Sequence, residues 1–166
     1  AAWSDYKATL VGSAPGKGGA AAVLAADARV LALAHQGTVQ YEAASGKPVG
    51  KLVNVAGRQR MLSQRMAKFY LASMLPVDAA LASTEITKAR TEFLSAMELL
   101  RNAPEATARI RDELLLADGQ WVFFDSALKK VQAGGSTKPL QDVFVSSENL
   151  LSVMDRVTGL YSAIKV

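Results

Sequence analysis

The side chains best suited to chemistry in this sequence are the cations of one short stretch. Between Ala43 and Val77 the chain has six basic residues and no aspartate or glutamate, although the whole chain has a net charge of only +4. These six residues are Lys47, Lys51, Arg58, Arg60, Arg65 and Lys68. Because guanidinium and ammonium groups bind anions, the stretch is the first candidate for a small-anion site.

A helical wheel gives the segment 47–75 two packing faces. The first seam must face a bundle core, and it consists of Leu52, Val55, Gln59, Leu62, Met66 and Phe69. A second seam consists of Val53, Gly57, Arg60, Gln64, Ala67 and Leu71. Because a helix in an isolated bundle needs only one such stripe, the second seam predicts a partner helix, most simply from a second subunit. A glycine inside a helix costs about 1 kcal/mol relative to alanine, and close approach of a partner backbone would account for Gly57.

Arg60 lies in the middle of the second seam. A guanidinium group drawn into an interface loses solvation worth several kcal/mol unless an anion meets it, and its own helix has no carboxylate. In a two-fold dimer Arg60 would also face its symmetry mate. A small planar oxyanion between the two guanidinium groups would relieve both problems. An ion pair with a neighbouring helix is the structural alternative for Arg60.

The predicted ligand-binding residues are therefore Gly57, Arg60, Gln64, Arg58, Ser63 and Arg65. Arg58 and Arg65 are seven residues apart and share a third face with Asn54. They either add positive potential to the site or pair with acids of neighbouring helices such as Glu85 or Glu92.

Other kinds of site find little support. The chain has no cysteine and a single histidine, His35, which argues against thiolate or histidine metal sites and against a Ser/His/Asp triad. No pair of carboxylates or activated nucleophile stands out. We therefore expect a protein that is not an enzyme, with no catalytic residue, no metal and no cofactor. The rest of the surface is balanced in charge and no aromatics are interleaved with the cations, so nucleic acid is not an expected partner.

The elements that position this segment are predicted to be helices. Half of the residues are apolar and only 7% are aromatic, a composition that favours an all-α fold. Glycine and proline clusters at 15–19, 45–50 and 134–139, with Pro76 and Pro104, mark the breaks. The sequence predicts an antiparallel four-helix bundle with helices near 48–75, 78–102, 105–132 and 139–164, preceded by a long helix near 19–45.

Apolar residues recur at the spacing of a bundle core in three of these helices. In 105–132 they are Ile110, Leu114, Ala117, Trp121, Phe124, Leu128 and Val131. In 78–102 they are Ala82, Ile86, Ala89, Phe93, Ala96 and Leu100, and in the last helix Val143, Leu150, Met154, Val157 and Tyr161.

The N-terminal 45 residues align with the C-terminal 46. Trp3 and Tyr6 match Trp121 and Phe124, and a Gly/Pro-rich connector follows in both. Two amphipathic helices also align by chance, but the match favours an internal repeat. We interpret 1–45 as a helical half-repeat that packs on the bundle formed by 47–166, with both tryptophans as core aromatics.

The stretch Asn54-Val-Ala-Gly-Arg-Gln-Arg-Met-Leu-Ser-Gln-Arg-Met-Ala-Lys68 resembles the signature of the PilJ-type domain, the N-terminal sensor domain of type IV pili methyl-accepting chemotaxis transducers. It is more distantly similar to the periplasmic sensor region of nitrate/nitrite sensor kinases. The resemblance covers roughly 47–166. It implies a periplasmic four-helix bundle that is usually dimeric. Members with known ligands bind nitrate or nitrite at the subunit interface through a glycine and an arginine, which here are Gly57 and Arg60.

Family receptors carry membrane-spanning helices and a cytoplasmic signalling module, which this sequence lacks. No apolar run reaches the roughly 18 residues that span a bilayer, and an Ala1-Ala2 start fits an exported chain whose signal peptide was removed. We expect a periplasmic sensor-type domain that binds a small oxyanion, forms a homodimer and works with a membrane receptor or signalling partner. The alternative is a helical scaffold whose basic helix docks an acidic partner or subunit.

Overall fold

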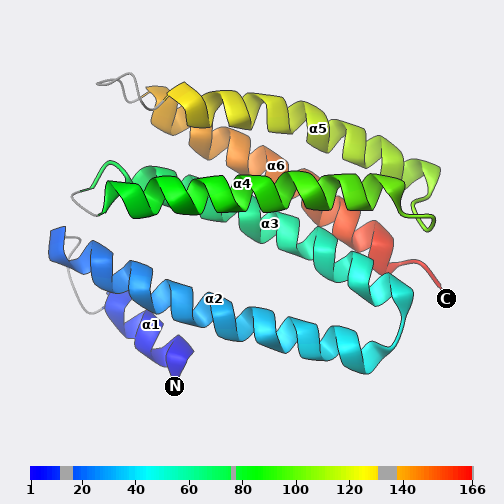
Figure 1. Cartoon of the computed structure of the whole chain (residues 1–166), viewed down its shortest axis with the longest axis horizontal. Helices are drawn as coiled ribbons and strands as arrows, with labels where there is room; N and C mark the ends of the chain where they lie inside the picture. Colours follow the sequence, from blue (N-terminus) through cyan, green and yellow to red (C-terminus); the bar gives the residue numbers. More distant parts are fainter. Residues whose placement is uncertain (12–16, 76–77, 131–137, 166) are drawn as a thin grey trace.

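The computed structural model describes residues 1–11, 17–75, 78–130 and 138–165, and this part of the chain contains six helices and no strand. The helices are α1 (Ala2–Val11), α2 (Lys17–Ser45), α3 (Pro48–Ala72), α4 (Ala79–Asn102), α5 (Ala108–Lys129) and α6 (Lys138–Ser162) (Figure 1). The all-α prediction is confirmed, and every predicted helix forms. The predicted breaks at Pro15, Pro76 and 134–137 lie outside the described residues.

Helices α3 to α6 form the four-helix bundle. Helix α3 packs between α4 and α6, and α5 packs on α6. The predicted core positions are confirmed for the most part, since fully or nearly fully buried side chains include Leu62, Met66, Phe93, Leu100, Leu114, Phe124, Leu150, Met154 and Tyr161. Val55, Ile86, Ala96 and Leu128 are only partly buried, and Val131 lies outside the described residues.

Local sequence explains where two of these helices begin. The Asp78 carboxylate accepts hydrogen bonds from the backbone amides of Ala80 (2.9 Å) and Leu81 (3.1 Å) at the start of α4. The Thr107 hydroxyl accepts one from the amide of Ile110 at the start of α5 (3.3 Å). Side-chain oxygens at this position satisfy amides that have no partner inside the helix.

The backbones of α4 and α5 approach each other less closely than the other neighbouring pairs of the bundle. Large aromatic side chains fill the space between them, because Phe93 stacks on Trp121 with ring centroids 4.6 Å apart and planes 15° apart. Ion pairs between Arg90 and Asp125 and between the Arg101 and Asp118 side chains lie at the edge of this contact.

The N-terminal helices form a separate pair beside the bundle. Helix α1 packs mainly on α2 and has no buried residue. The prediction that both tryptophans are core aromatics is therefore wrong for Trp3, which is 57% exposed, and right for Trp121, which is 9% exposed. The physical reason is that α1 meets one neighbouring helix, whereas α5 borders the centre of a four-helix core.

After a turn at Gly46, whose φ of 59° lies in the region that favours glycine, helix α3 runs back along α2. The Glu42 carboxylate accepts a hydrogen bond from Asn54 near this turn, and Asp27 pairs with Lys68 further along. The two helices therefore run antiparallel (Figure 1). The division into a half-repeat at 1–45 and a bundle at 47–166 stays a prediction.

Candidate functional site

All six predicted ligand-binding residues lie on α3, but they point in three directions. Gly57, Arg60 and Gln64 lie on the side of α3 that meets α6. Arg58 and Arg65 reach toward α4. Ser63 is fully buried in the bundle, where its hydroxyl donates to the Arg60 carbonyl oxygen (2.9 Å). The structure thus places Gly57, Arg60 and Gln64 on one side of α3, whereas the Ser63 side chain is buried in the bundle.

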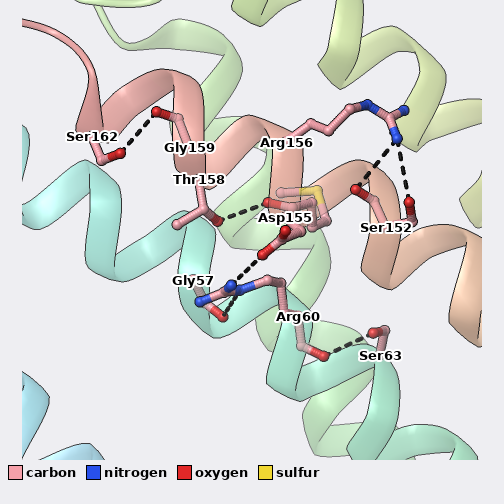
Figure 2. Close-up of polar contacts among 10 residues, drawn as sticks. Gly57, Arg60, Ser63, Ser152, Asp155, Arg156, Thr158, Gly159 and Ser162 are labelled. Carbon is pink, nitrogen blue, oxygen red and sulfur yellow. Dashed lines mark hydrogen bonds and ion pairs between the residues drawn. The ribbon is translucent and has the colours of Figure 1, made fainter.

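The Arg60 guanidinium group forms an ion pair with Asp155 of α6 (Figure 2). Its Nε also faces the carbonyl oxygen of Gly57 at 3.5 Å. The side chains of Arg60 and Asp155 are 40% and 64% exposed, respectively. An ion pair this exposed stabilises a fold by about 0 to 1 kcal/mol, so its two partners separate at little cost.

Gln64 contacts the same neighbouring helix one turn further along. Its Nε2 donates to the Glu148 carboxylate (3.0 Å) and reaches the Ser147 carbonyl oxygen at 3.4 Å. The second seam of α3 therefore meets α6 of its own chain. The homodimer expected on this seam stays a prediction.

A groove lies beside Arg60, between α2, α3 and the end of α6. Its volume is about 620 Å³. Apolar residues form much of its wall, with Arg58, Asn54 and Thr158 as polar members. We call it the Arg60 groove and define it by Leu31, Val53, Asn54, Gly57, Arg60 and Thr158. Helix α2 supplies one wall, so a same-chain helix borders the part of the second seam that holds Gly57 and Arg60.

The other two arginines of the motif pair with acids of α4, which is one of the two alternatives that the sequence analysis gives for them. Arg58 donates to both carboxylate oxygens of Glu92, with Nη2 3.2 Å from Oε2. Arg65 pairs with Glu85, whose side chain is only 14% exposed. The hydrogen bond from Arg65 outweighs burial and holds the pKa of Glu85 below its usual value. Arg60 therefore has the most exposed carboxylate partner of the three.

Sequence reasoning missed the contribution of α6 to this site. Neither Asp155 nor Thr158 is among the residues predicted for the site from the sequence. The available signal was the spacing of Glu148 and Asp155, which are seven residues apart and so lie on one face of α6. That face meets Gln64 and Arg60 on α3.

A family model described as type IV pili methyl-accepting chemotaxis transducer N-term (PilJ) matches residues 41–144. The match spans more than half of the chain and includes the whole of α3, α4 and α5. The chain belongs to the PilJ family. The resemblance to the PilJ-type domain is thereby confirmed, and the protein is a signalling domain of the chemotaxis-transducer type. The more distant similarity to nitrate/nitrite sensor kinases stays a prediction.

Comparisons of this PilJ domain with curated proteins and with solved structures found no match. Among the helices that the structure describes, none is long and apolar enough to cross a membrane.

The surroundings of Gly57 in the PilJ domain lead to a stability prediction. A Cβ atom at this position would lie 3.5 Å from Nη2 of Arg60 and 3.8 Å from Cγ2 of Thr158, which are ordinary contacts. Gly57→Ala should therefore raise the free energy of unfolding of the single chain by about 0.5 to 1 kcal/mol, because alanine favours the helix. Urea denaturation measures the change.

Gly37→Ala in α2 is the matched control, since a Cβ atom there meets nothing within 4 Å. A gain at Gly37 with a loss at Gly57 would contradict the prediction and would indicate that a further backbone packs against Gly57.

Proposed function

We propose that this PilJ domain is a periplasmic sensor that binds a small planar oxyanion, nitrate or nitrite, at Arg60. The observation that carries the proposal is the setting of the Arg60 guanidinium group. It borders a groove of about 620 Å³, and its carboxylate partner Asp155 is itself 64% exposed. Family membership supports the sensor role, and the groove supports a ligand that enters from solvent.

The chemistry of the site suits a planar anion with one negative charge. A guanidinium group offers parallel N–H donors that match two oxygens of such an anion. In the free protein the Asp155 carboxylate accepts from one of these donors. When the ligand binds, an oxygen of the anion takes the place of this carboxylate oxygen. Arg58 also borders the groove and adds positive potential, although Glu92 largely neutralises it.

Displacement of the Asp155 carboxylate from Arg60 by the ligand links anion binding to the arrangement of the helices. The Arg60–Asp155 pair joins α3 to α6 (Figure 2). An anion that takes the place of Asp155 releases this connection, so α6 shifts relative to α3 at this level. A ligand shifts the balance between two conformations only if it binds one of them more tightly. Here the anion binds the conformation in which the Arg60–Asp155 ion pair is broken more tightly than the conformation in which it is formed. A membrane receptor or signalling partner that contacts α6 would then respond to its change in position.

Thermal denaturation in the presence of nitrate tests the proposal. A ligand that binds only the folded state stabilises it by about 2.7 kcal/mol at 100 times its dissociation constant. For a domain of this size, nitrate at that concentration should raise the melting temperature by about 5 to 10 °C.

Chloride at the same ionic strength is the control, because salt screens any group of surface charges. Nitrate and chloride shifts of equal size would contradict a specific oxyanion site. A larger shift with nitrite than with nitrate would keep the site and change its preferred ligand.

A further inference from the structure

The Arg60 groove is much larger than the inorganic anion proposed to bind there. Its volume is about 620 Å³. A water molecule, which has one heavy atom, occupies about 30 Å³ of the liquid, so the four heavy atoms of nitrate would fill roughly 120 Å³. Cavities of about 300 to 1,000 Å³ with mostly apolar walls and a few polar groups are typical of sites for organic molecules. Most of the groove is therefore available to the body of a larger ligand.

One stripe of helix α2 forms an apolar wall of the groove. Leu31, Ala34, Thr38 and Tyr41 line the groove from this helix. Each is three or four residues from the next, so their side chains lie on one face of α2. Leu31 is only partly buried and Tyr41 is 81% exposed. Helix α3 therefore leaves part of this stripe uncovered on the side of the groove.

Helices α3 and α6 add apolar surface next to Arg60. Val53 lies one turn before Gly57 on α3 and is partly buried against the bundle core. The Cγ2 methyl carbon of Thr158 lies beside Gly57 (Figure 2). The Thr158 hydroxyl donates instead to the Met154 carbonyl oxygen of its own helix (2.7 Å). The surface around the Arg60 guanidinium group is therefore largely hydrocarbon.

The other hydroxyl groups that line the groove are also engaged within their own helices. Each donates its proton to a carbonyl oxygen three or four residues earlier, and these pairs are Thr38 with Ala34 (3.0 Å), Ser45 with Glu42 (2.8 Å) and Ser162 with Gly159 (2.8 Å). A ligand body rich in hydroxyl groups would lose its hydrogen bonds to water and find no free hydroxyl proton on these residues. An apolar body needs no such donor.

The charges of the groove favour an anionic head group. The lining residues include Lys47, Arg58 and Arg60, whereas the carboxylate of Glu42 accepts a hydrogen bond from Asn54. A carboxylate resembles nitrate in the features that matter to Arg60. It is planar, carries one negative charge and presents two oxygens to the parallel donors of a guanidinium group.

We propose that the Arg60 groove also binds a small organic monocarboxylate, whose carboxylate pairs with Arg60 and whose apolar body lies against Val53 of α3 and the Leu31 face of α2. The inference rests on the proposed function in one respect, namely that Arg60 is the anion-binding group. The subsite for the apolar body lies mainly on α2, outside the basic motif of α3. A monocarboxylate and nitrate compete for Arg60, so the domain responds to either anion.

Isothermal titration of the full chain with acetate and with benzoate tests the apolar subsite. The two anions share a head group, and benzoate adds a ring. Burial of about 60 Å² of apolar surface corresponds to about tenfold in affinity, so benzoate should bind about tenfold more tightly than acetate. Arg60→Ala should abolish the binding of both. Equal affinities for the two anions, no binding of benzoate, or full benzoate binding in Arg60→Ala would overturn the proposal.

Leu31→Ala separates the contact with the apolar body from the contact with the head group. The ratio of benzoate to acetate affinity should fall about threefold or more, because part of the α2 wall is removed. Leu33→Ala is the matched control, since Leu33 also lies on α2, is 51% exposed and does not line the groove. An unchanged ratio in Leu31→Ala would overturn the placement of the body on α2.

Nuclear Overhauser effects in the unmodified chain give the same test without a substitution. The ring protons of bound benzoate should show effects to the methyl groups of Leu31 and Val53. Bound benzoate without effects to either residue would overturn the proposed subsite.

Titration with nitrate distinguishes this inference from the proposed function. Arg60-dependent binding of benzoate without any binding of nitrate would overturn the nitrate proposal and keep this one. Arg60-dependent binding of nitrate without benzoate would overturn this inference and leave the proposed function intact. When both anions bind, saturating nitrate should raise the apparent dissociation constant of benzoate. An unchanged constant would overturn the shared use of Arg60.

Discussion

Phe93→Ala should lower the free energy of unfolding by about 3 to 5 kcal/mol. Phe93 is fully buried, and its ring stacks on Trp121 at 4.6 Å between two helices whose backbones are comparatively far apart. Because the two rings hold α4 and α5 at this separation, the cavity left by alanine does not close easily. The melting temperature should fall by about 10 °C or more. Urea denaturation gives the change in free energy.

Leu81→Ala on the same helix provides the control, since Leu81 is 47% exposed and its loss should cost well under 1 kcal/mol. A loss at Phe93 no larger than the loss at Leu81 would show that α4 moves toward α5 and fills the space.

The core could be predicted from the sequence because the spacing of apolar residues in each bundle helix shows which of its faces is buried. The spacing from Ile110 to Phe124 fixes which side of α5 is buried, whatever the partner helix is. The environment of Trp3 could not be predicted in this way. The alignment of Trp3 with Trp121 compares residue types only, whereas burial depends on how many helices surround the side chain. Helix α1 packs mainly on α2, so Trp3 stays exposed.

The candidate site shows the same limit. The wheel of α3 predicted a second packing face with Gly57 and Arg60, and it named Glu85 and Glu92 as possible partners of the other arginines. It did not predict that Asp155 pairs with Arg60. The Arg60–Asp155 contact depends on which face α6 turns toward α3. The residue pattern of either helix taken alone does not determine this orientation.

If nitrate binds at Arg60, Arg60→Ala should abolish the nitrate-dependent rise in melting temperature, which corresponds to a loss of about 2.7 kcal/mol at 100 times the dissociation constant of the unmodified protein. Arg60→Lys should also bind poorly, because an ammonium group lacks the planar pair of donors. Arg101→Ala is the matched control. The Arg101 side chain is 40% exposed, like that of Arg60, and it pairs with Asp118 (2.6 Å) away from the groove.

Asp155→Asn should change binding in the opposite direction. In the free protein the Asp155 carboxylate competes with the ligand for the Arg60 guanidinium group and repels the incoming anion. Two unit charges about 4 Å apart interact by about 1 kcal/mol in water and more near a protein surface, so the neutral amide should tighten nitrate binding about five- to tenfold. Isothermal titration measures this change. A full nitrate shift retained in Arg60→Ala, or weaker binding in Asp155→Asn, would show that the anion binds elsewhere or that Asp155 helps to hold the site in its binding geometry.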